Sequence, residues 1–316
     1  MEKLRRLSLP LADRTLPPMA NAPQLDFPEF VSRRRQEHQS GESRASRRDY
    51  AYSVDHKMRE QFERMKPVEL AVAAALRTFG RVVKGQLLGS SVRVSDRQFP
   101  RLQKLVASCA DTLSIPVPAV YIVNDPRLNA ATYGTDDEAF IMIHSALVDH
   151  FTDEELLTVI GHECGHIHNR HVVYLTTLHV LTQVVGVVAQ WAALPATLAL
   201  RAWQRRAEIT CDRAGMLCGK SEATAARALT KLALGSKRLY EEFNLEAFLE
   251  QHDETKENIG RYMEVFASHP WLPKRVLAMR TFGQSELFRE ATAQGTGGLS
   301  MSEVDDRVSS LLKWES

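Results

Sequence analysis

A run of 29 residues, 172–200, contains no Asp, Glu, Lys or Arg, and it limits how this chain can fold. As one straight helix it would be about 43 Å long, because an α-helix rises about 1.5 Å per residue. That is more than the ~30 Å hydrocarbon core of a bilayer, and the composition by itself is typical of a membrane-spanning helix. The residues on either side of the run decide whether a single span is allowed.

Just before this run, residues 162–166 read His-Glu-Cys-Gly-His. Side chains four positions apart share one face of a helix, so His162 and His166 can direct both imidazoles at one metal ion. Glu163 lies about 100° further round the helix, where it can hold a water molecule against that ion. This spacing is typical of a zinc hydrolase, which has two histidine ligands and a general base on one helix.

The helix that carries this motif has a clear predicted start. Thr152 can accept a hydrogen bond from the amide of Glu155, and the Glu155 side chain can reach back, which forms a capping box. Gly165, inside the motif, would let another element pack closely against the helix. These features indicate that residues 162–166 form a metal-binding site and are not a chance match to a short motif.

A candidate for the third ligand follows the charge-free run, where Glu208 and Asp212 repeat the four-residue spacing. Glu208 can complete three protein ligands and leave a fourth position for water, as a catalytic zinc site requires. Asp212, one turn further on, can accept the second ring N–H of a ligand histidine and so fix its tautomer. We therefore expect one Zn²⁺ per chain, held by His162, His166 and Glu208.

This ligand set excludes a single span, because His166 before the run and Glu208 after it must meet at one ion. The chain has to go out and return, and residues 186–195 offer a place to turn. Each arm would be about 14 residues or roughly 21 Å, which is too short to cross a bilayer. We expect a helical hairpin over 172–200 that packs internally, enters one membrane leaflet or self-associates. We favour packing or self-association, because polar residues such as His179 are costly in lipid.

Two nearby histidines are not expected to be ligands. On an ideal helix His168 and His171 lie about 240° and 180° from His162, so we interpret them as surface or packing residues. The metzincin pattern would place Gly and His where this chain has Asn169 and Val172. Glutamate is therefore the expected third ligand.

Outside the helices, short apolar stretches bounded by turn residues predict strands at 119–123 and 138–144, with 129–133 as a candidate third strand. Helices are expected at 56–88, 97–113 and 203–218.

Four blocks of the sequence resemble, in order, the CAAX prenyl endopeptidase family of gluzincins, which includes the HtpX and BepA-type proteases. The blocks are NAATYG, LTVIGHECGHIHNRH, EITCDRAG and SHPWLPKRVLAM, and the similarity covers about 100–282. The resemblance implies a mainly α-helical α+β fold, a zincin-like metallopeptidase with a small antiparallel sheet over the active-site helix.

The resemblance also implies roles. Strand 138–144 would be the edge strand that holds an extended protein or peptide substrate. His269 and Arg275 would lie near the site and stabilise the oxyanion or orient a ligand carboxylate. For His269 the alternative is a helix cap without a catalytic part. The implied function is that of a zinc-dependent metalloendopeptidase with a zinc-activated water and Glu163 as general base. The alternatives are an inactive peptide-binding relative and an aminopeptidase-type hydrolase.

We divide the chain into a flexible basic arm (1–55), the metallopeptidase domain with the inserted hairpin (56–290) and a C-terminal tail (291–316). The arm is interpreted as a solvated tail, with an autoinhibitory or membrane role as the alternative. The formal net charge of +1 argues against nucleic-acid binding. Four cysteines without a CxxC pair and no visible signal peptide favour a cytoplasmic, or membrane-associated, protein.

Overall fold

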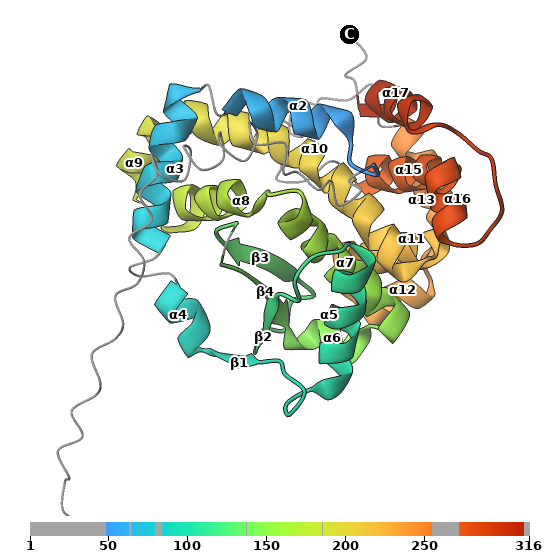
Figure 1. Cartoon of the computed structure of the whole chain (residues 1–316), viewed down its shortest axis with the longest axis horizontal. Helices are drawn as coiled ribbons and strands as arrows, with labels where there is room; N and C mark the ends of the chain where they lie inside the picture. Colours follow the sequence, from blue (N-terminus) through green and yellow to red (C-terminus); the bar gives the residue numbers. More distant parts are fainter. Residues whose placement is uncertain are drawn as a thin grey trace, which may run out of the picture.

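The computed structural model of the chain describes residues 49–62, 65–79, 84–136, 138–184, 186–254 and 272–312 (Figure 1). His269 and residues 1–48 of the arm lie outside this part of the chain. The helices are α2 (Ser53–Phe62), α3 (Lys66–Thr78), α4 (Lys84–Gly89), α5 (Pro100–Thr112), α6 (Ser145–His150), α7 (Asp153–His168), α8 (Val172–His179), the π-helix η2 (Val180–Val184), α9 (Val187–Ala192), α10 (Leu194–Gly219), α11 (Glu222–Leu234), α12 (Lys237–Glu241), α13 (Leu245–Glu254), α15 (Leu272–Gly283), α16 (Glu286–Ala291) and α17 (Met301–Leu312). The strands are β1 (Ser91–Arg93), β2 (Ala119–Val123), β3 (Ala130–Gly134) and β4 (Ala139–His144).

The expected fold class is confirmed, because the chain is mainly helical and carries one small sheet. The sheet has the order β1-β2-β4-β3, in which β2 and β4 run parallel and the other pairs are antiparallel. It is therefore mixed, and the expectation of a purely antiparallel sheet was wrong. The chain passes from β2 to the far edge to form β3, and then turns back so that β4 lies between the two.

This strand order also corrects the prediction that 138–144 is the edge strand. β4 pairs with β2 on one side and with β3 on the other, and Ile141 and Ile143 within it are fully buried. The edge next to α7 and α8 is β3.

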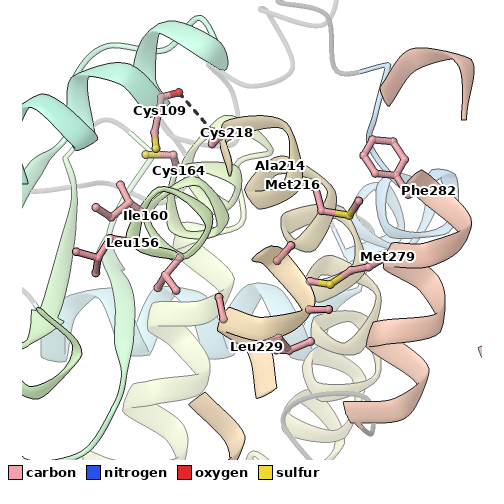
Figure 2. Packing of buried hydrophobic residues seen from close by; sticks show 14 of the residues in the cluster. Cys109, Leu156, Ile160, Cys164, Ala214, Met216, Cys218, Leu229, Met279 and Phe282 are labelled. Carbon is pink, nitrogen blue, oxygen red and sulfur yellow. Dashed lines mark hydrogen bonds between the residues drawn. The ribbon is translucent and has the colours of Figure 1, made fainter. Parts of the chain in front are cut away.

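The core of the molecule forms around α7 and α10, which pack along their lengths. Glycines allow the close approach: a Cβ on Gly165 would lie 2.7 Å from Ala214 Cβ, and one on Gly215 would lie 2.6 Å from the Thr158 carbonyl oxygen. Figure 2 shows the surrounding core, in which Ile160 of α7 and Met216 of α10 lie among side chains from α5, α11 and α15. The predicted capping box at the start of α7 is confirmed, since both of its hydrogen bonds are present.

The charge-free run is divided among α8, η2, α9 and the start of α10. Val173 and Leu178 on the outgoing arm, and Leu200 on the returning arm, are buried in one cluster with Val68 and other residues of α3. Figure 1 shows α8 and α10 leading away from and back to α7. Among the described residues, no helix is both long enough and apolar enough to cross a membrane.

Both ends of the described chain pack against α10. Tyr50 and Tyr52 are buried, and the Tyr52 amide donates to Thr210 Oγ1 over 3.1 Å. Residues 49–55 thus belong to the packed domain, although sequence analysis placed them in the flexible arm. The helix α17 lies within the predicted tail, yet it buries Val304 and Val308 in the main core.

Candidate metal centre

Facing sides of α7 and α10 bring the three predicted metal ligands together. His162 Nε2 lies 3.6 Å from Glu208 Oε2, and His166 Nε2 lies 3.7 Å from Glu208 Oε1. The carboxylate is 1% exposed, so both imidazoles converge on a buried acceptor. Two imidazole nitrogens and one carboxylate are a donor set typical of catalytic zinc. The residues present therefore fit the ion that the sequence predicts.

Asp212 and Arg275 fix the orientation of this ligand set. Asp212 Oδ1 lies 3.1 Å from His162 Nδ1, which leaves Nε2 of that ring directed at Glu208. Arg275 donates from Nε to Asp212 Oδ2 over 2.8 Å, and its Nη2 lies 3.3 Å from Glu208 Oε2. Of the two roles that the resemblance implied for Arg275, orientation of a ligand carboxylate matches these contacts.

The charges in the site favour a cation. Burial by itself would raise the pKa of Asp212, but the charge and hydrogen bonds of Arg275, together with His162, lower it overall. Burial would lower the pKa of His162, but its hydrogen bond to Asp212 and the nearby carboxylates raise it. Among the described residues that line the site, the carboxylates are those of Glu163, Glu208 and Asp212, and the only guanidinium is that of Arg275, which pairs with Glu208 and Asp212; the four groups sum to a net charge of −2. A divalent cation would balance that charge.

Glu163 lies beside the ligands and lines a cavity of about 330 Å³. Thr132 on β3 donates a hydrogen bond to Glu163 Oε2 over 2.6 Å and so holds the carboxylate in place. His162, Glu208 and Arg275 line the same cavity. Another part of the cavity wall is apolar. It consists of Ala225, Ala228, Leu229, Leu232 and Ala233 of α11 with Leu272 and Met279 of α15.

The structure corrects the interpretation of His171. Its side chain is 1% exposed, and its Nδ1 lies 3.2 Å from Nδ1 of His166, so it does not face away from the site. The ideal helical geometry that predicted the direction of the His171 side chain does not extend to that residue, because α7 ends at His168 and Arg170 adopts a left-handed φ of 58°. His168 is buried, so of the surface and packing roles that were expected for it, it has the packing role. Its Nδ1 lies 2.8 Å from the Tyr50 hydroxyl.

Cys211 also approaches the ligands, but it lies on the Nδ1 side of the His166 ring, whereas Glu208 lies on the Nε2 side. Its Sγ lies 3.2 Å from His166 Nδ1, and it could join His162 and His166 in a three-residue metal group. However, His166 faces Glu208 with its other nitrogen, Nε2. Burial also raises the pKa of the Cys211 thiol well above its ordinary value, which disfavours the thiolate that binds metal. The geometry therefore favours Glu208 as third ligand.

The edge strand β3 passes along the site with two positions whose backbone groups do not pair with β4. His144 donates its amide to the Asn129 carbonyl, so alternation of antiparallel pairs turns the backbone groups of Ala130 and Thr132 outward. Ala130 also lines the cavity.

Comparisons with known proteins agree with this geometry. The chain is 32% identical over 206 residues to the plastoglobule-localized metallopeptidase 48, chloroplastic, of Arabidopsis thaliana, covering 61% of this chain and 60% of that protein. It thus spans less than two thirds of that relative's length. It is 26% identical over 227 residues to a protease HtpX homolog of Tropheryma whipplei (strain Twist), covering 62% of this chain and 77% of the relative. It is 27% identical over 223 residues to one of Moorella thermoacetica, covering 60% and 75%.

The model of peptidase family M48 matches residues 96–282, which include both helices of the site. The resemblance drawn from the four sequence blocks is thereby confirmed, and the chain belongs to peptidase family M48.

Proposed function

We propose that this chain is a zinc-dependent metalloendopeptidase. The observation that carries the proposal is the convergence of His162 Nε2 and His166 Nε2 on the buried Glu208 carboxylate, with Glu163 beside them in the cavity. The names of the relatives, a metallopeptidase and two proteases, support the same activity.

A Zn²⁺ held by these residues would activate a water molecule and polarise the carbonyl of the scissile bond. Glu163 then acts as general base: it takes the proton of the water and delivers it to the leaving amine. The hydrogen bond from Thr132 positions the Glu163 carboxylate for both transfers. Arg275 and Asp212 keep the ligands oriented. Because the activated water is the nucleophile, no side chain of the protein has to act as one.

The substrate is proposed to bind as an added strand on β3 rather than on β4. Ala130 and Thr132 present outward N–H and C=O groups, which an extended peptide can pair with. The apolar wall of α11 faces the same cavity and favours an apolar substrate side chain.

An endopeptidase fits the cavity better than an aminopeptidase. An aminopeptidase needs a further acidic group to bind the free amine of its substrate. Among the described residues that line the cavity, the only carboxylates are Glu163, Glu208 and Asp212. All three already have roles at the metal centre.

We retain self-association as the proposed role of the tip of the hairpin. There Val188 is 85% and Trp191 is 72% exposed, in a segment without a charged side chain. Contact with a membrane surface is the alternative outcome, and a requirement for detergent during fractionation would reveal it.

Glu163→Gln tests the proposed mechanism. The variant should keep its zinc content and lose about 10²–10⁴-fold in turnover of a peptide blocked at both ends, because only the base is removed. His166→Ala should lose zinc as well. Wild-type turnover by Glu163→Gln would refute the mechanism, and a wild-type chain that binds zinc but cleaves no peptide would favour the inactive, peptide-binding alternative.

A further inference from the structure

A line of buried side chains leads from His166 to the N-terminal segment of the domain. His166 Nδ1 lies 3.2 Å from His171 Nδ1, and His171 Nε2 lies 3.0 Å from Asp55 Oδ2. Asp55 in turn accepts hydrogen bonds from Trp203 Nε1 over 2.8 Å and from Thr210 Oγ1 over 2.7 Å. All five side chains are at most 4% exposed, so water does not compete for these contacts.

The donors and acceptors along this line allow a consistent assignment, in which the Cys211 thiol lies beside both Nδ1 atoms, 3.2 Å from that of His166 and 3.6 Å from that of His171. If His166 offers the lone pair of Nε2 to a metal, its Nδ1 carries the proton and donates to Nδ1 of His171. A neutral His171 then carries its own proton on Nε2 and donates to Asp55. Trp203 can only donate, so it holds the Asp55 carboxylate in the acceptor role. Each hydrogen in the line therefore has an acceptor.

The two histidine ligands are thereby supported in parallel ways. His162 is oriented by a direct contact with Asp212, which belongs to the family-matched residues. His166 is oriented by Asp55 acting through His171. Asp55 lies outside the matched range of 96–282, at the start of α2.

We propose that Asp55 and His171 are positioning residues of the metal centre, and that the Asp55 carboxylate, held by residues 49–62, orients His166 through His171. This inference rests on the proposed function, because it assumes that His166 binds zinc. It assigns to the N-terminal segment a part in metal binding, in addition to its packing against α10 and α17.

The same segment has a second anchor that does not touch the metal line, which supplies a matched control. The Ser53 amide donates to Asp305 Oδ2 over 3.0 Å, and Arg213 Nη1 donates to Asp305 Oδ1 over 2.8 Å. Asp305→Asn therefore weakens docking of the segment with the same chemical change as Asp55→Asn. It leaves His166 and His171 untouched.

The experiment uses the full chain and three readouts: the Zn²⁺ dissociation constant from chelator competition, the visible spectrum of the Co²⁺-substituted protein, and the midpoint of urea unfolding. Asp55→Asn should weaken zinc binding by about 10–100-fold, the usual effect of losing a group behind a ligand histidine, and should change the Co²⁺ spectrum. Asp305→Asn should lower the unfolding midpoint but keep the wild-type zinc affinity and Co²⁺ spectrum.

His171→Gln removes the imidazole link but leaves the contacts of Asp55 with Trp203 and Thr210 and the contact of Ser53 with Asp305 in place, and it should reproduce the loss of zinc affinity. Combined with Asp55→Asn it should cause little additional loss, since both changes break one line. If either variant is folded and binds zinc with wild-type affinity and spectrum, the proposal is overturned. Equal losses for Asp305→Asn and Asp55→Asn would overturn it too, because docking alone would then explain the effect.

The zinc readout separates this inference from the proposed function. A wild-type chain that binds no zinc would contradict both. A chain that binds zinc without cleaving peptides would contradict only the proposed peptidase, and the comparison of variants would still decide the positioning roles.

Discussion

Gly165 controls the distance between the two helices of the metal centre, and its replacement by alanine gives a prediction with a calculable size. A Cβ at this position would lie 2.7 Å from Ala214 Cβ and 3.2 Å from Cys211 Cα. Non-bonded carbons prefer a separation of roughly 3.5–4.0 Å, so α7 and α10 would have to move apart by about 1 Å. Both contacted atoms are fixed to α10 and cannot swing away as the end of a flexible side chain can.

Overpacking of this kind typically costs about 1–3 kcal/mol, and the rigid neighbours place Gly165→Ala near the upper end. Alanine gains about 1 kcal/mol over glycine in a helix, so the expected net loss of unfolding free energy is about 2 kcal/mol. The same movement would draw His166 away from Glu208 and lengthen the distance between His166 Nε2 and Glu208 Oε1, which is 3.7 Å. Zinc binding should weaken, and turnover should fall by up to about 100-fold, as for a 1 Å misplacement.

Urea unfolding followed by circular dichroism, with chelator competition for zinc, measures both effects. Gly186→Ala is the matched control, because no atom of the described residues, its chain neighbours aside, lies within 4 Å of a Cβ there, and its φ of −68° suits alanine. Its unfolding free energy should stay within about 0.5 kcal/mol of wild type. Adding Ala214→Gly to Gly165→Ala removes the nearest contact and should restore part of the zinc affinity. Wild-type stability and zinc affinity in Gly165→Ala would refute the reasoning.

Three further changes test other parts of the site. Asp212→Asn should weaken zinc binding by about 10–100-fold in chelator competition, because it removes the charge behind His162; unchanged affinity would show that Asp212 does not support the ligand. Thr132→Val should keep zinc but lower kcat by about 10-fold, less than the roughly 10²–10⁴-fold that a general base itself contributes, because Glu163 loses its hydrogen bond but stays in place; a change in KM alone would contradict a role in positioning the base. Val188→Ser combined with Trp191→Ser should reduce any self-association seen by sedimentation, since both side chains are exposed; an unchanged oligomeric state would exclude the tip as an interface.

The features that were predicted correctly from sequence depend on local geometry. Thr152 and Glu155 lie three residues apart, so their capping box is a property of one helical turn. The spacing of His162 and His166 fixes them on one face of α7 for the same reason. Glu208 was predicted from its four-residue spacing to Asp212, and the return of the charge-free run was inferred because His166 and Glu208 must meet at one ion.

The errors arose where the answer depends on contacts between distant segments. His171 was misplaced because a left-handed residue ends the helix, and nothing in the local pattern marks Arg170 as that residue. The apolar stretch at 138–144 predicts a strand, but it does not tell which strands will lie on either side. Asp55 sits in a polar stretch of sequence, and only the packing of α2 on α10 brings it to His171.

The charge-free run does more than join the two helices of the site, because α8 also limits the edge strand. The Gly134 amide donates to Thr176 Oγ1, and the same hydroxyl donates to the Gly134 carbonyl, each over 3.0 Å. These are the outward backbone groups that follow those of Ala130 and Thr132 on β3. An added peptide strand can therefore pair at Ala130 and Thr132 but not beyond, since Thr176 already occupies the next position. The helix that leads away from the zinc ligands thus fixes one end of the proposed substrate-binding edge, next to Glu163.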